Sequence, residues 1–110
     1  MGPRVIICDT CAVPGQAPQG EAFAEKLRTR VAESVSVETV SCMNQCDRPI
    51  SLALRSEGKD VYLFHSLDPA RDLDDTLALI DLYVRAEGGT IEDARPAGRL
   101  RHCLTGRVPR

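Results

Sequence analysis

The chain has 110 residues, 43% of them apolar, with no tryptophan and four aromatic side chains, which suits one domain with a modest core. Fourteen basic and sixteen acidic residues give a formal net charge of −2. No stretch is long and apolar enough to span a bilayer, and the first residues lack the apolar region and cleavage site of a signal peptide. We therefore expect a cytoplasmic protein that does not contact a membrane. In the cytoplasm a reducing thiol pool disfavours structural disulfides.

The first half of the chain predicts a strand, a helix and a second strand. A short apolar run over Arg4–Ile7 predicts the first strand. Prolines and glycines make residues 12–20 a loop, and a helix is predicted over residues 21–34. One face of that helix carries three apolar side chains at every fourth position: Phe23, Leu27 and Val31. Valines alternate with polar residues over 36–41, which predicts the second strand.

The second half predicts a hairpin and a second helix. Residues 50–55 and 60–65 read as two strands joined by a turn in which Gly58 adopts a positive φ. Asp68 and Pro69 form a typical helix start, and the two glycines at 88–89 end that helix. Its buried stripe is expected to consist of Leu73, Leu77, Ile80 and Val84.

The predicted order, β-α-β-β-β-α, indicates an α/β protein with a small mixed sheet and a thioredoxin-like layout. We assign this domain to residues 1–94, which carry sixteen acidic and nine basic residues. Residues 95–110, the C-terminal tail, carry five arginines and no acidic residue. The tail is expected to be a solvated arm or a strap on the acidic surface of the domain. Because no aromatic residue lies among these arginines to stack on bases, we do not expect nucleic-acid binding.

Four of the five cysteines form two close pairs. Two residues lie between Cys8 and Cys11, three lie between Cys42 and Cys46, and thirty separate the pairs. The first pair follows the first predicted strand and the second pair follows the second strand. Because these strands are expected to be neighbours ending at the same edge of the sheet, their loops can bring four sulfur atoms together.

Three kinds of site use cysteines in this way. Four thiolates are the ligands that a 2Fe–2S cluster requires, and they can also hold one tetrahedral zinc ion. Zinc ribbons usually have tighter pairs, roughly fifteen to twenty residues apart, so the spacing fits zinc less well. A thiol–disulfide oxidoreductase would use Cys8 and Cys11, but such enzymes place their cysteines at the start of a helix. Here nine residues of loop separate Cys11 from the predicted helix.

The pattern also carries a family resemblance. A C-x2-C pair, thirty residues and then C-M-N-Q-C-D-R-P, with its proline at Pro49, resembles the thioredoxin-like 2Fe–2S ferredoxins, including the small iron–sulfur subunit of respiratory complex I. Those ferredoxins usually space the first pair more widely. Nearly the whole chain is similar to a bacterial family of predicted metal-binding proteins of unknown function. Three segments carry that similarity: I-C-D-T-C, S-C-M-N-Q-C-D-R-P-I-S-L-A-L and L-R-H-C-L-T-G-R-V-P.

The resemblance implies a ferredoxin variant of the thioredoxin-like fold. It also implies a 2Fe–2S electron-transfer protein whose ligands are Cys8, Cys11, Cys42 and Cys46. The alternative is a structural or metal-handling protein in which the same four cysteines bind zinc. We expect no enzymatic activity, because no catalytic set or phosphate loop is visible. The expected partner is a redox protein, and a homodimer is left open. The fifth cysteine, Cys103, is expected to be a small packing residue where the tail folds back.

Overall fold

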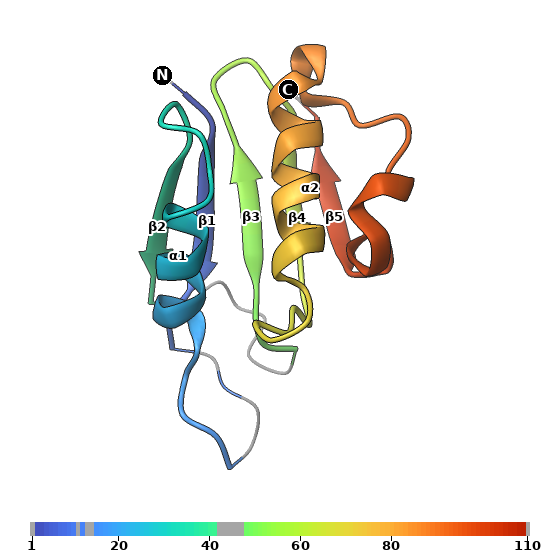
Figure 1. Cartoon of the computed structure of the whole chain (residues 1–110). Coiled ribbons are helices and arrows are strands. Elements are labelled where there is room, and N and C mark those ends of the chain that lie inside the picture. The colour runs from blue at the N-terminus through green and yellow to red at the C-terminus, as the bar shows by residue number, and fades with distance from the viewer. Residues whose placement is uncertain (1, 11, 13–14, 42–47, 110) are drawn as a thin grey trace.

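The computed structural model describes residues 2–10, 12, 15–41 and 48–109. Its strands and its two α-helices are labelled in Figure 1, and η1 and η2 denote 3-10 helices. They run in the order β1 (Arg4–Cys8), α1 (Gly20–Arg28), β2 (Ser36–Val40), β3 (Leu52–Arg55), β4 (Val61–Phe64), α2 (Leu73–Arg85), η1 (Glu87–Gly89), η2 (Arg95–His102) and β5 (Leu104–Val108). Within these described ranges, no helix combines the length and the apolar character needed to cross a membrane.

The strands form one mixed sheet in the order β2-β1-β3-β4-β5. β1 and β2 are parallel, with Cys8 opposite Val40, whereas the other neighbouring strands are antiparallel. The predicted α/β class and the order of the first six elements are therefore confirmed. The parallel pair is the feature that matters for the cysteines, because parallel neighbours end at the same edge of a sheet.

The C-terminal tail supplies a strand that we did not expect. β5 pairs with β4 at the edge of the sheet, and η2 packs beside α2. Three tail arginines pair with acidic residues of the chain: Arg95 with Asp93, Arg99 with Asp72 and Arg107 with Asp60. The tail is thus packed against the rest of the chain, with two of these ion pairs made to the buried carboxylates of Asp60 and Asp72, and part of it completes the sheet. The expected domain boundary at residue 94 stays a prediction.

The predicted hairpin is confirmed. Gly58 has a φ of 77°, and the Lys59 amide donates to the Ser56 carbonyl at 3.1 Å, which closes the turn between β3 and β4. A positive φ is strained for residues with a Cβ but not for glycine, which is why the turn falls at this position.

Helix α1 is shorter than predicted, because it ends at Arg28 rather than near residue 34. Thr29 terminates it: its hydroxyl donates to the Lys26 carbonyl at 2.9 Å, a bond that competes with helix continuation. Phe23 and Leu27 are fully buried as expected, whereas Val31 lies beyond the helix and is only partly buried.

Helix α2 begins at Leu73, later than the predicted start at Asp68. Asp68 instead opens a turn, in which its carboxylate accepts from the Ala70 amide at 2.9 Å and its carbonyl accepts from the Asp72 amide at 2.8 Å. The buried face also differs from the expected stripe. Of that stripe only Ile80 is buried, and the face is made of Thr76, Leu79, Ile80 and Tyr83.

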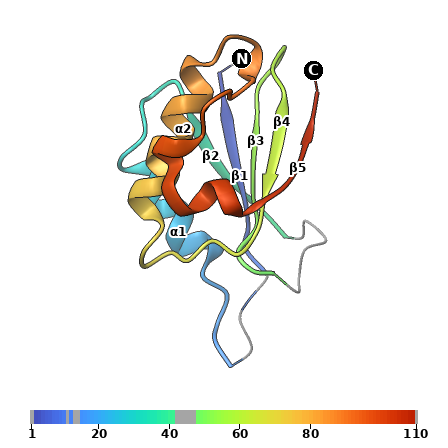
Figure 2. The same cartoon turned by 90° about the vertical axis from the view of Figure 1, so that its right-hand side faces the viewer.

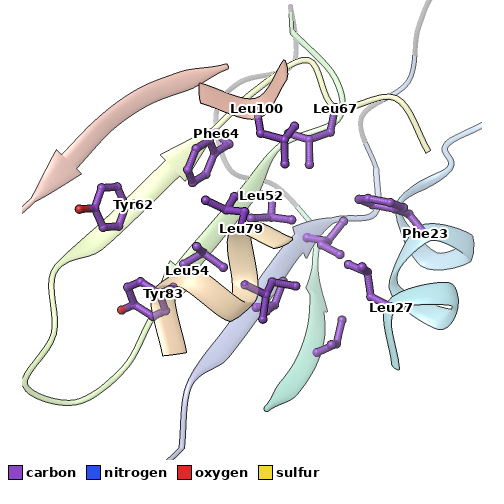
Figure 3. Packing of buried hydrophobic residues seen from close by; sticks show 14 of the residues in the cluster. Phe23, Leu27, Leu52, Leu54, Tyr62, Phe64, Leu67, Leu79, Tyr83 and Leu100 are labelled. Carbon is purple, nitrogen blue, oxygen red and sulfur yellow. The ribbon is translucent and has the colours of Figure 1, made fainter. Parts of the chain in front are cut away.

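Helices α1, α2 and η2 all lie on one face of the sheet (Figure 2). The core fills the space between this face and the helices. Figure 3 shows side chains from both layers meeting there: Phe23 and Leu27 from α1, Leu79 and Tyr83 from α2, Leu100 from η2, and Leu52, Leu54, Tyr62 and Phe64 from the sheet.

Candidate metal centre

Cys8 is the last residue of β1, and its backbone is held from both sides. Its amide donates to the Ser51 carbonyl at 3.2 Å, and the amide of the next residue, Asp9, donates to the Val40 carbonyl at 2.9 Å. The Cys8 side chain is fully buried. One cysteine of the predicted set is therefore the last residue of an interior strand, β1, whose C-terminal end points to the bottom of Figure 1.

Three chain segments meet at this edge of the sheet. β1 leads toward Cys11, β2 leads toward Cys42, and the segment that follows Cys46 enters β3 beside Cys8. The predicted adjacency of the strand ends is confirmed. Cys11, Cys42 and Cys46 themselves lie outside the described residues, so the four-cysteine ligand set stays a prediction.

Two oxygen atoms lie near the Cys8 sulfur. Cys8 Sγ is 3.6 Å from the Thr10 hydroxyl and 3.9 Å from the Ser41 carbonyl. The Thr10 hydroxyl also donates to that carbonyl, which ties the segment after β1 to the segment after β2. This bond joins the residue just before Cys11 to the residue just before Cys42.

The start of helix α1 packs directly against this strand end. A Cβ at Gly20 would overlap the Cys8 carbonyl oxygen and would lie 2.9 Å from the Asp9 Cα. Only glycine allows this close approach. The loop between Cys11 and the helix therefore folds back, so that the start of the helix meets the end of β1. In space, the helix begins beside Cys8.

Ser51 was not predicted as part of the site. It is fully buried, and its hydroxyl has no hydrogen-bond partner among the residues that the structure describes. Its position opposite Cys8 follows from the register of β1 and β3, in which Ile7 faces Leu52. A serine just before an apolar strand gives no signal in the sequence that it lies opposite a cysteine.

Across the described part of the chain, no group of three or more His, Cys, Asp or Glu side chains could hold a metal ion. A pocket of about 450 Å³ lies between the loop that follows Cys11 and the segment before α2. Ala12, Pro49, Asp68 and Arg99 are among its lining residues. It is therefore bordered by segments that flank both cysteine pairs.

An ion pair stabilises one wall of this pocket. The Arg99 Nε donates to Asp72 Oδ1 at 3.0 Å, and the same guanidinium donates to the Ser66 carbonyl at 2.7 Å. The Asp72 side chain is only 1% exposed. Burial acts to raise the pKa of Asp72, but hydrogen bonds from Arg99 and from the Asp68 amide outweigh it, so the pKa lies below its usual value.

Cys103 is buried and packs in the core, as expected from the sequence. Its thiol is 3.7 Å from the Arg99 carbonyl, to which it donates. Burial is the main cause that raises the pKa of this thiol above its usual value. A thiol kept neutral in an apolar environment is a poor metal ligand.

The fold defines the class of protein. Two solved structures resemble the chain, both of thioredoxin-like [2Fe-2S] ferredoxins from Aquifex aeolicus. The first, a wild-type protein, is 11% identical with a TM-score of 0.61, over 96% of this chain and 97% of that one. The second is 18% identical with a TM-score of 0.56, over 96% and 92%. At these identities the likeness establishes a thioredoxin-like fold.

The chain belongs to the DUF1636 family, which is described as "protein of unknown function". The model of this family matches residues 5–110. No curated protein matches the chain. The expected relation, to a family of unknown function with the fold of thioredoxin-like ferredoxins, is confirmed.

Proposed function

We propose that this protein is a one-electron carrier that binds a 2Fe–2S cluster through Cys8, Cys11, Cys42 and Cys46. The observation that carries the proposal is the parallel pairing of β1 and β2, with Cys8 opposite Val40. This pairing starts both cysteine-bearing segments from neighbouring strands at one edge of the sheet.

The chemistry of the described residues fits such a group. Cys8 and Thr10 lead into Cys11, and Ser41 leads into Cys42, with the Thr10 hydroxyl bonded to the Ser41 carbonyl. Thr10 and Ser41, each bonded covalently to a proposed ligand, are therefore in contact with one another. Thiolates from two such segments are the donor set that iron–sulfur clusters use.

The cluster, when bound, would supply the capacity to accept and release one electron. The protein would hold it at a rigid point, because the Cys8 amide is bonded to Ser51, just before β3, and the Asp9 amide is bonded to Val40 of β2. Burial of Cys8 would keep water away from this ligand. The solved structures that share the fold are ferredoxins, which supports the same assignment.

The proposed role is electron transfer to another protein and not catalysis on a substrate. We propose a redox protein as the partner, docking at the edge of the sheet that carries the cysteine segments, where an electron has the shortest path. We also propose a cytoplasmic location, because its reducing thiol pool would keep the cysteines available as thiolates.

The test is the visible spectrum of protein purified without oxygen. We expect a red-brown sample whose charge-transfer bands bleach with dithionite and whose reduced form gives an electron paramagnetic resonance signal. Cys8→Ser and Cys42→Ser should each abolish the colour, because one thiolate of the set is lost.

Cys103→Ser is the matched control, because Cys103 is a buried packing residue on η2's C-terminal side and is not part of the proposed set. It should keep the spectrum. A colourless wild-type protein with one zinc per chain would replace the electron carrier with the zinc alternative. Disulfide reductase activity without any metal would support the thiol–disulfide alternative instead.

A further inference from the structure

We infer that the Ser51 hydroxyl donates a hydrogen bond to the Cys8 sulfur when that sulfur is a thiolate ligand, and so raises the reduction potential of the centre. This inference rests on the proposed function and adds a residue to it. It begins from one unusual atom: the Ser51 hydroxyl is buried and has no hydrogen-bond partner among the described residues.

Strand pairing places Ser51 beside Cys8. Ile7 faces Leu52 in the antiparallel pair, and one step further the Cys8 amide donates to the Ser51 carbonyl at 3.2 Å. Directly opposed residues of a sheet project their side chains on the same face, with Cβ atoms about 4.5–5.5 Å apart. Ile7 and Leu52 both belong to the core, so Cys8 and Ser51 share the opposite face.

An unpaired buried hydroxyl is costly. Leaving a buried donor without a partner costs its desolvation free energy, and native proteins contain few such groups. A serine hydroxyl rotates to suit an acceptor. The position of Ser51 is therefore explained if an acceptor appears beside it in the functional state of the protein.

Metal binding would convert Cys8 from a hydrogen-bond donor into an acceptor. As a thiol, Cys8 can itself donate to the nearby oxygen atoms of Thr10 or Ser41. As a thiolate ligand it has no proton and needs donors. Thr10 has a single hydroxyl proton, which already bonds the Ser41 carbonyl. Ser51 is the neighbouring hydroxyl whose proton is not used by any described residue.

The sign of the effect follows from charge. Adding an electron makes the ligand sulfur more negative, so a hydrogen bond to that sulfur is stronger in the reduced state. Hydrogen bonds to the sulfurs are among the features that set the potential of iron–sulfur centres. A Ser51 hydroxyl that bonds Cys8 therefore favours reduction.

The experiment compares the midpoint potentials of the loaded wild-type protein and of Ser51→Ala, measured by optical redox titration. Ser51→Ala should have a more negative potential, equivalent to a several-fold smaller equilibrium constant for reduction. Ser51→Thr keeps the hydroxyl and should have a potential close to that of the wild type. Ser36→Ala is the matched control, because Ser36 is exposed and pairs with Arg4 at the other end of the sheet.

A second measurement separates this role from a packing role. In the metal-free protein the hydroxyl is unpaired, so Ser51→Ala should unfold at the same urea concentration as the wild type, or at a higher one. A lower midpoint would show that Ser51 serves the fold rather than the thiolate, and would overturn the inference.

Further outcomes are decisive. If Ser51→Ala loads normally and its potential is unchanged, the inference is wrong while the proposed function stands. If Ser51→Ala cannot hold the cluster but Ser51→Thr can, the hydroxyl is required and the inference is supported. Failure of both variants to load would assign Ser51 to packing and overturn the inference. A wild-type protein that never binds a cluster would instead overturn the proposed function.

Discussion

Gly20 is the residue with the tightest steric limit near Cys8. We predict that Gly20→Ala destabilises the metal-free protein by about 1–3 kcal/mol, the usual cost of inserting a methyl group into packed space. The reason is that the new Cβ would overlap the Cys8 carbonyl oxygen, a backbone atom that cannot move without disturbing β1. Urea unfolding measures the change.

Gly106→Ala is the control for this prediction. A Cβ at Gly106 would meet no heavy atom within 4 Å, so this variant should unfold like the wild type. Equal effects of the two substitutions would show that the contact between helix α1 and Cys8 is looser than described.

The Asp72 carboxyl links stability to pH. Its pKa in the folded protein lies below the usual value of 3.8, although burial alone would raise it, because Arg99 and the Asp68 amide bond to the ionised form. A carboxyl whose pKa is lowered by folding stabilises the protein above its unfolded pKa. That contribution is lost as the pH falls below about 3.8 and through the folded value.

We therefore predict that the stability difference between the wild type and Asp72→Asn shrinks as the pH falls below about 3.8. Denaturant unfolding at a series of pH values measures it. Asp74→Asn is the control, since the Asp74 side chain is 87% exposed, and its difference from the wild type should not change in the same way. If the stability difference between the wild type and Asp72→Asn did not change with pH, the lowered pKa of Asp72 would be contradicted.

At the scale of elements, an ion pair joins η2 to Asp72, the residue just before helix α2. Arg99 is 33% exposed and bonds the buried carboxylate of Asp72, whereas Arg95, on the same η2, is 79% exposed and pairs with the exposed Asp93. We predict that Arg99→Met costs about 3 kcal/mol, because it leaves a buried charge without its partner. Arg95→Met should cost less than about 1 kcal/mol, as exposed pairs do.

Thermal unfolding of the two variants tests this prediction, because each replaces an arginine of η2 by a flexible apolar side chain. A similar loss of stability in both would show that the Asp72 carboxylate is satisfied without Arg99.

The sequence predicted those elements whose periodicity reflects burial. The hairpin was found because two apolar runs flank a short turn that contains Gly58, and α1 was found from Phe23 and Leu27. β5 was not found, because it is an edge strand in which four of the five residues are exposed, so it lacks a buried stripe. The start of α2 was misplaced, because Asp68 opens a separate turn in which its carboxylate accepts from the Ala70 amide, and an Asp-Pro pair suits a turn as well as a helix start.

The candidate site was predictable only in part. Cysteine spacing and strand order placed Cys8 at the C-terminal end of its strand, beside the end of β2, and the structure confirms this. Gly20 and Ser51 were not singled out, because their importance comes from what lies opposite them in space. A glycine at the start of a helix and a serine before a strand are both common, so neither attracts notice alone.

At the scale of the whole molecule, a bound centre would join segments that the sheet alone leaves separate. We predict that the loaded protein is more stable than the metal-free protein by about 3 kcal/mol or more, since a ligand that binds only the folded state stabilises it by mass action. Thermal unfolding without oxygen, before and after removal of the metal with a chelator, measures the difference.

Cys42→Ser provides the comparison for this last prediction. Because it lacks one proposed ligand, the chelator should leave its unfolding temperature unchanged. A wild-type protein whose unfolding temperature is also insensitive to the chelator would show that no centre contributes to folding.

The order of the strands also ranks how readily parts of the sheet open. β2 and β5 lie at the edges, each with one neighbouring strand, while β1, β3 and β4 are bonded on both sides. Peripheral strands fray with little loss of structure, so amide hydrogens there exchange with solvent earliest, and those along the middle exchange latest. Cys8 belongs to that slowly exchanging middle. Its thiol would therefore keep its position through the small openings that a folded chain undergoes continually.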